Sequence, residues 1–85
     1  MYRILTEDKN RRLVKLLLYR WRDKIHGYTM SFAEGAWNGE EEQAMTIDFI
    51  GVPFEIVKRL AEVIKHINGQ QEVWVLDIPA TVTKV

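Results

Sequence analysis

Cysteine is absent from this chain of 85 residues, which excludes a disulfide framework, a thiolate zinc site and a cysteine nucleophile. No uncharged apolar run approaches the length of a membrane span, and the first residues lack the apolar core of a signal peptide. We therefore expect a soluble, cytoplasmic protein that makes no contact with a membrane. The length leaves room for a single domain, residues 1–85.

The chain also lacks a net charge, because 12 basic side chains balance 12 acidic ones. This balance argues against general nucleic-acid binding, which depends on neutralising phosphates. The charges are nevertheless segregated, with basic residues dominating 9–24 and acidic residues dominating 34–48. Each group is typical of a solvated face. Alternatively, the two patches complement each other between subunits, or the basic one meets an anion.

The signatures of several familiar activities are missing as well. The sequence has no Gly-x-Gly-x-x-Gly or other phosphate-cradling loop, no Cys-x-x-Cys and no RNA-recognition pattern of stacking aromatics. His26 and His66 each lie near the end of a predicted helix, where an imidazole complements the helix dipole. An enzyme would need these two rings together in a polar cleft. We expect no catalytic residue, no metal and no cofactor, and hence a protein that is not an enzyme.

The clearest structural signal lies between residues 28 and 50. Two alternating apolar runs flank Asn38-Gly39, a pair that favours a type I′ hairpin turn because both central residues need a positive φ. The apolar residues of both runs should share one face, since a slip of one residue would turn one set to water. These are Tyr28, Met30, Phe32, Met45, Ile47 and Phe49.

Helices are predicted on either side of this hairpin. The first should run from about residue 9 to 25, capped by Thr6 or Asp8 and stopped by Gly27, with an apolar stripe at helical spacing. The second should follow Gly51-Val52-Pro53 and end at Asn68-Gly69.

Short strands complete the pattern, at 2–6 and 72–78. The order β-α-β-β-α-β predicts an α+β, ferredoxin-like fold. In that arrangement a four-stranded antiparallel sheet has its first and third strands in the centre and two helices on one face.

The last strand is apolar on both of its faces, which leaves its orientation open. Either Trp74 points at the helices and Val73 and Val75 lie on the open face of the sheet, or the reverse assignment exposes Trp74. In both cases apolar side chains face outward, and contiguous exposed apolar area usually marks an interface. We therefore expect a homo-oligomer, with Val73, Val75 and Val82 at the interface, Val82 because the chain after Pro79 could reach a neighbour.

Two groups of residues are candidates for contact with a ligand or partner. Arg11, Arg12 and Lys15 open the first helix, where free backbone N–H groups also favour anions, unless they merely solubilise that face. Trp37 is either a cap over the adjacent core or a platform on which a ligand or a partner stacks. The acidic run that includes Glu41 and Glu42 cannot converge on one cation, since consecutive strand residues face opposite ways, but it could contact a partner or blunt an edge strand.

Two motifs carry a resemblance to a known group of proteins. Gly35-x-Trp37-x-Gly39-x-x-Glu42 and Asn68-Gly69-Gln70-Gln71-Glu72-x-Trp74-Val75 resemble those of small uncharacterised ferredoxin-like proteins of phages and bacteria. The resemblance implies no catalytic residue. It implies a phage accessory protein that acts by stoichiometric binding in the cytoplasm of the host.

Two hypotheses of function follow. In the first, a homo-oligomer sequesters a small anionic or nucleotide-derived ligand as an anti-defence protein, using Arg11, Arg12, Lys15 and Trp37. In the second, the chain is a protein-interaction module or inhibitor that docks on a host protein through its acidic hairpin.

Overall fold

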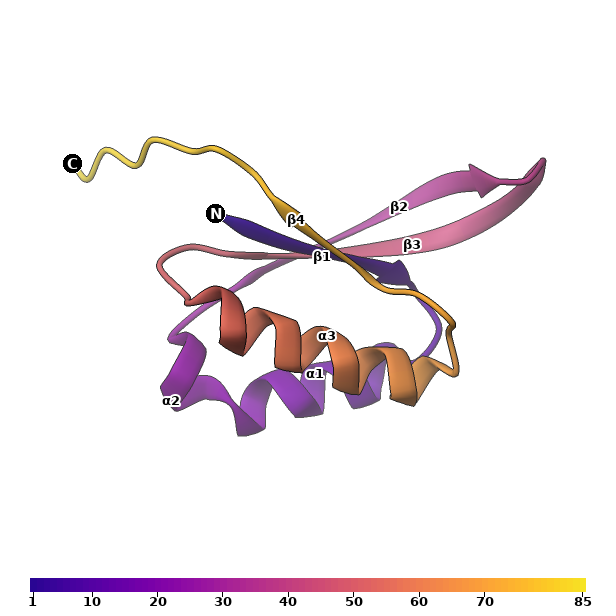
Figure 1. Cartoon of the computed structure of the whole chain (residues 1–85), viewed down its shortest axis with the longest axis horizontal. Helices are drawn as coiled ribbons and strands as arrows, with labels where there is room; N and C mark the ends of the chain where they lie inside the picture. Colours follow the sequence, from indigo (N-terminus) through magenta and orange to yellow (C-terminus); the bar gives the residue numbers. More distant parts are fainter.

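Four strands and three helices make up the computed structural model, which describes all residues except the side chain of Trp37. The strands are β1 (Tyr2–Glu7), β2 (Thr29–Trp37), β3 (Glu40–Phe49) and β4 (Trp74–Asp77), and the helices are α1 (Arg11–Arg20), α2 (Arg22–Ile25) and α3 (Phe54–Asn68). The strands form one antiparallel sheet in the order β2-β3-β1-β4, and the helices cover one of its faces (Figure 1). The predicted α+β class and antiparallel sheet are confirmed. No helix of the described residues is long and apolar enough to cross a membrane.

The hairpin between β2 and β3 turns at the predicted pair. Asn38 and Gly39 have φ values of 53° and 78°, the left-handed conformation that a type I′ turn needs at both positions. Its register places Met30 opposite Ile47 and Phe32 opposite Met45, so the apolar residues share one face as expected.

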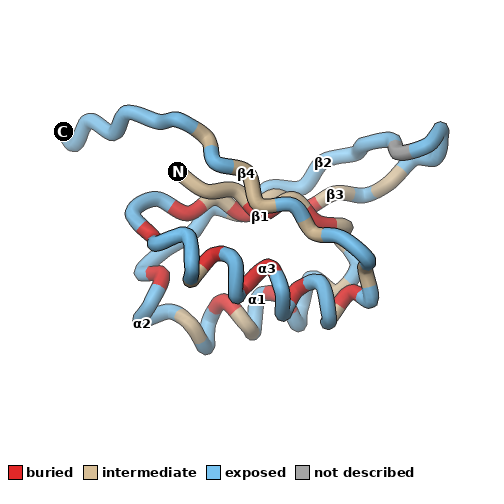
Figure 2. The backbone as a smooth tube through the Cα atoms, in the orientation of Figure 1, coloured by how far each residue is buried: buried red, intermediate tan, exposed pale blue. Residues whose placement is uncertain are grey.

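Burial along this hairpin is nonetheless uneven. Met45 of β3 is fully buried, whereas Phe32 of β2 is 42% exposed. The reason is that β2 is an edge strand, and the turn end of the hairpin projects beyond the helices (Figures 1 and 2).

The core lies between the sheet and the helices, where the buried segments of both layers face each other (Figure 2). Its side chains come from the central strands, from α1 and α3 and from the segments that follow α1 and β3. They are Ile4, Val14, Leu18, Ile25, Met45, Ile47, Phe49, Val52, Val57, Leu60, Ala61 and Ile64.

The first helix differs from its prediction at both ends. It begins after Asn10 rather than at a Thr6 or Asp8 cap, because Thr6 lies buried within β1 and Asp8 binds Arg11 instead. It also breaks at Trp21 (φ −97°, ψ 10°), which separates α1 from α2. The left-handed stop is His26 (φ 57°), so the prediction that Gly27 takes this position is wrong.

The second predicted helix, α3, has the expected ends. Pro53 precedes its first residue with φ −60°, and Gly69 follows Asn68 in the left-handed conformation (φ 62°). The N–H groups of Gly69 and Gln70 bind the carbonyls of His66 and Lys65, which satisfies orphan acceptors of the last turn.

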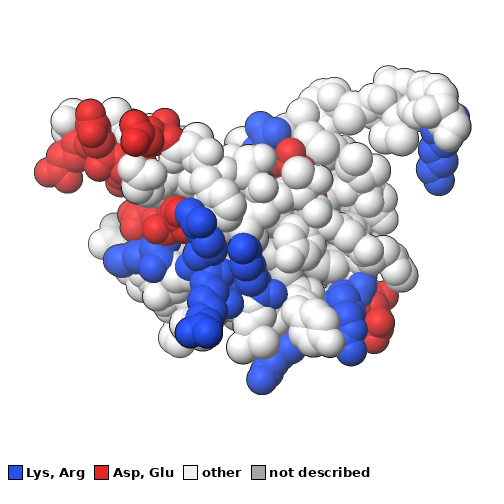
Figure 3. Space-filling view, turned by 180° about the vertical axis from the view of Figure 1, so that it is seen from behind, with Lys and Arg blue, Asp and Glu red and all other residues white. Residues whose placement is uncertain are grey.

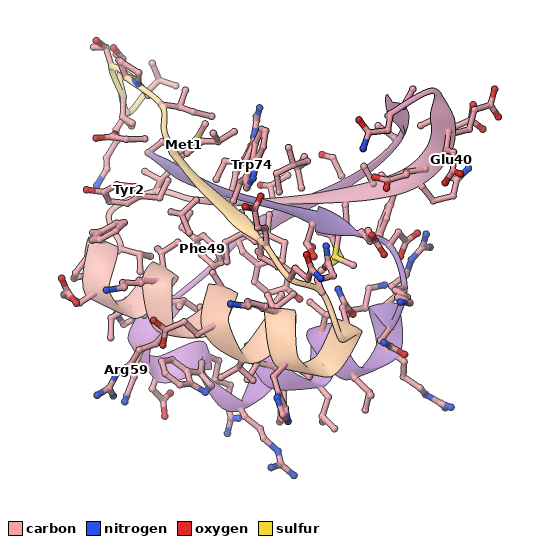
Figure 4. The ribbon with its side chains drawn as sticks, turned by 45° about the vertical axis from the view of Figure 1, so that its right-hand side comes forward. Met1, Tyr2, Glu40, Phe49, Arg59 and Trp74 are labelled. Carbon is pink, nitrogen blue, oxygen red and sulfur yellow. The ribbon has the colours of Figure 1, made fainter. Side chains whose placement is uncertain are left out.

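Pairing with β1 decides the orientation of the last strand. Val75 lies opposite Ile4, which is fully buried, so Val73 and Val75 pack against the core. The alternative that placed these two valines on the open face is therefore wrong, and Trp74 is the exposed residue. Figure 4 shows Trp74 and Phe49 on opposite sides of the sheet. Beyond Asp77 the described chain forms no further strand.

Candidate functional site

The turn end of the β2–β3 hairpin carries a group of carboxylates that we call the acidic arm. Its members lie on both strands and are Glu34, Glu40, Glu41 and Glu42. Glu42 is half-buried and the others are exposed. None of the four forms an ion pair with a described residue. Figure 3 shows them as an acidic cluster at one extremity of the molecule.

The register spreads the four carboxylates over both faces of the arm. Glu40 and Glu42 lie opposite Trp37 and Gly35, and Glu41 lies opposite Ala36. Alternate strand residues face opposite ways, so Glu41 shares a face with Glu34, and Glu40 shares the other with Glu42. Among the described residues no group of three or more His, Cys, Asp or Glu side chains could hold a metal ion. The arm therefore has negative charge on both of its faces.

A shallow, open hollow of about 190 Å³ lies at the base of the arm. Carboxylates dominate its lining, which consists of Glu7, Asp8, Lys9, Glu42 and Gln43. Asp8 is paired with Arg11 and Lys9 is basic, so Glu7 is the one carboxylate without an ion pair to a described residue that the hollow adds to the arm.

Arg11, a member of the predicted basic site, already has partners within the molecule. Its guanidinium donates from Nε to Asp8 Oδ1 at 3.2 Å and from Nη2 to the other carboxylate oxygen. Its Cζ also lies 3.6 Å from the centre of the Phe32 ring, a cation–π contact. Hydrogen bonding to Asp8 raises the pKa of Arg11 above its ordinary value. Arg11 therefore links α1 to the edge strand and keeps its charge at any physiological pH.

The other basic members of that site follow Arg11 along α1, with Lys15 one turn further on. Arg12 and Lys15 are exposed on α1, and neither forms an ion pair with a described residue. The side chain of Trp37 lies outside the described residues. Its backbone is five positions along β2 from Phe32, about 17 Å in an extended strand.

The two histidines lie far from each other. His26 ends α2 and His66 lies in the last turn of α3, and these two segments are at opposite ends of the helix layer (Figure 1). The two rings therefore do not share the one polar cleft that an enzyme using both would need. His66 lines a second open hollow, of about 390 Å³, with Glu62, Lys65, Gly69 and Gln70.

The predicted interface residues lie in different parts of the molecule. Val73 and Val75 are on the core side, Glu41 and Glu42 belong to the acidic arm, and Val82 is 53% exposed in the segment after Pro79.

The open face has an ion pair at its centre. Arg3 Nε lies 2.6 Å from Asp48 Oδ1 and Nη2 lies 3.0 Å from Oδ2, and this hydrogen bonding raises the pKa of Arg3. Leu5, Trp74 and Leu76 adjoin the pair toward the β4 edge.

Sequence reasoning missed a polar cluster that joins the ends of three elements. Thr6 and Asn68 are buried and bind each other, and Gln70 and Asn10 complete the set. On sequence alone, Asn68-Gly69-Gln70 indicates only a helix stop followed by a loop. The signal that could have revealed the cluster is the concentration of amide side chains at one helix end.

A comparison of the chain with protein-family models, with curated proteins and with solved structures finds no match. The resemblance to phage and bacterial proteins consequently stays a prediction from the two motifs.

Proposed function

We propose that this protein is a non-enzymatic interaction module whose acidic arm docks on a basic surface of another protein. The observation that carries the proposal is the position of four carboxylates, without an internal ion pair, on a strand pair that projects beyond the helices (Figures 1 and 3). A projecting arm can reach a partner while the helices stay clear of it.

The electrostatics of the arm support a contact of this kind. Glu40 and Glu41 are exposed and form no ion pair with a described residue, so their charge faces solvent. Exposed charge of one sign steers an oppositely charged partner and raises the association rate more than it raises affinity. Glu7, which lines the hollow at the base of the arm, adds one further carboxylate without an ion pair to a described residue.

The fold assignment that goes with this function is a ferredoxin-like one. Support comes from the central position of β1 and β3 and from the covering of one sheet face by helices. The assignment adds nothing to the functional argument, because folds of this kind host unrelated activities.

Photo-crosslinking from within the arm tests the proposal. Ala36 is exposed and lies opposite Glu41, so benzoylphenylalanine at position 36 samples whatever the arm contacts. Lys58, exposed on α3, is the matched control position. In an extract of cells that express the protein we expect a discrete adduct from position 36 and none from position 58.

A charge-neutral arm gives the second comparison. Replacing Glu34, Glu40, Glu41 and Glu42 by Gln should abolish the adduct while circular dichroism stays unchanged. Equal adducts from both positions, or an adduct that survives neutralisation, would overturn the proposal.

A second candidate is the sequestration of a small anionic or nucleotide-derived ligand on α1. It is favoured by Arg12 and Lys15, which lack ion pairs with described residues, and by an Asn10 side chain that does not cap its own helix. The ion pair of Arg11 with Asp8 makes this second candidate weaker than docking by the arm. Calorimetry against cyclic nucleotides and ADP-ribose derivatives tests it, and the absence of heat across that panel would exclude it.

A further inference from the structure

The outer edge of β4 has backbone groups that point away from the sheet. Met1 and Ile78 exchange two hydrogen bonds, Ile78 N to Met1 O at 2.8 Å and Met1 N to Ile78 O at 3.2 Å. In an antiparallel ladder such pairs alternate with pairs that exchange none. Given the register of β1 and β4, Leu76 and Trp74 bond to β1. The N–H and C=O groups of Val75 and Asp77 therefore point outward.

This outward pattern is complementary to itself. Val73, Val75 and Asp77 share the outward direction, and Pro79, the next in the series, has no N–H to offer. A pairing strand can thus use residues 73–77, a segment whose centre is Val75. Two copies of such a segment can pair antiparallel about a two-fold axis through Val75. Each outward N–H of one copy then meets an outward C=O of the other.

We propose that two copies of this chain associate through β4, antiparallel and with Val75 opposite Val75. In this register Val73 of each copy lies opposite Asp77 of the other, and Trp74 lies opposite Leu76. No like charges face each other across the new pair, because the only charged residue of the segment meets a valine. The occupant of this edge is therefore a second copy of the chain.

Apolar side chains on the open face add to the backbone pairing. Trp74 is 46% exposed and Leu76 half-buried, and Leu5 lies opposite Trp74 on β1. At non-hydrogen-bonded positions of an antiparallel pair, opposite Cα atoms are about 4.5 Å apart, so each Trp74 packs on a Leu76 of the other copy. Aromatic–aliphatic cross-strand pairs of this kind stabilise sheets.

The dimer has an eight-stranded sheet with β2 at both ends. Seven strand spacings separate the two β2 strands, roughly 34 Å at about 4.8 Å each. The two acidic arms therefore lie at opposite ends of the assembly, each free of the new interface. The dimer does not depend on what the arms bind.

Disulfide trapping tests the register, and the absence of natural cysteine makes the background clean. In the double variant Trp74→Cys/Leu76→Cys, the cysteine at position 74 of one copy lies opposite the cysteine at position 76 of the other. Their Cα separation is compatible with a disulfide. Mild oxidation should yield a covalent dimer of twice 10.0 kDa. Each single variant places its cysteines two residues out of register, about 8 Å apart, and should form no covalent dimer under oxidation.

A charge pair tests the same contact without covalent chemistry. The wild type should sediment as a dimer, Trp74→Lys/Leu76→Lys as a monomer with unchanged circular dichroism, and Trp74→Glu/Leu76→Lys as a dimer again. A monomeric wild type at all concentrations would overturn the proposal. So would single-cysteine variants that cross-link as well as the double one, or two charge variants that sediment alike.

Discussion

Asn68 Nδ2 donates a hydrogen bond of 3.1 Å to Thr6 Oγ1, which joins residues 62 positions apart. The same nitrogen donates to the Glu7 carbonyl at 3.2 Å and to Gln70 Oε1 at 3.0 Å, and Asn68 Oδ1 accepts from Asn10 at 3.2 Å. Thr6 and Asn68 are only 4% and 3% exposed. Every buried side-chain N or O atom of the described residues has a partner. This cluster ties the end of α3 to β1 and to the start of α1.

Removing the amide should destabilise the protein. Asn68→Ala removes the amide that donates to Thr6, Gln70 and the Glu7 carbonyl and accepts from Asn10. Thr6 keeps its bond to Gln70 and Asn10 keeps its bond to the Ile67 carbonyl, and removing one partner from a buried polar cluster costs about 1–3 kcal/mol. We expect the free energy of unfolding in urea to fall by about that amount. Gln71→Ala, at an exposed neighbouring position, is the control and should change it by less than about 0.5 kcal/mol. Equal stability of the two variants would contradict a structural role for the cluster.

The glycine that follows α3 should be sensitive to substitution for a different reason. Gly69 has φ 62°, and a Cβ there meets nothing within 4 Å, so the cost of Gly69→Ala comes only from the left-handed backbone, about 1 kcal/mol. Gly27→Ala is the matched control, because Gly27 has an equally open surrounding and no left-handed φ. We expect thermal melts to show a lower midpoint for the first variant and an equal or higher one for the second. Equal losses at both positions would contradict this account.

Features set by neighbouring residues could be predicted from the sequence. The Asn38-Gly39 turn and the Gly69 stop both depend on a backbone conformation that adjacent residues specify, and both are present. The shared face of Met45 and Phe32 follows from a period of two residues, which a hairpin register preserves.

Features set by distant residues could not be predicted. Thr6 satisfies the local rule for a helix cap, yet Gln70 and Asn68 engage its hydroxyl from more than 60 positions away. The last strand is apolar on both faces, so it lacks the alternation of apolar and polar residues that would predict its buried face. Its pairing with Ile4 on β1 decides that Val75 is inside and Trp74 outside. The basic site was harder still, since the contact of Arg11 with the Phe32 ring depends on how α1 lies against β2.

Phe49, the last residue of β3, and its neighbour Ile50 differ sharply in burial. Substitutions at these two positions should therefore differ in their effect on stability. Phe49 is fully buried and Ile50 is 62% exposed. Phe49→Ala should lower the free energy of unfolding by about 3–5 kcal/mol, whereas Ile50→Ala should change it by less than about 0.5 kcal/mol. Urea denaturation of the two variants measures both. If the first variant does not fold, Phe49→Leu should still show a loss relative to Ile50→Ala. A loss at Ile50 as large as at Phe49 would contradict the face assignment.

Ionic strength should separate the acidic arm from the β4 edge. Contacts of Glu40 and Glu41 with a basic partner are exposed, and added salt screens exposed charges beyond about 10 Å at 0.1 M. The yield of the adduct from position 36 should therefore fall steadily as sodium chloride is raised. The proposed dimer depends on backbone hydrogen bonds and on Trp74 packing against Leu76, so its sedimentation should not change over the same range. If the adduct resists salt while the dimer dissociates, both accounts are wrong. The dimer would then depend on charge, and the contact of the arm would not.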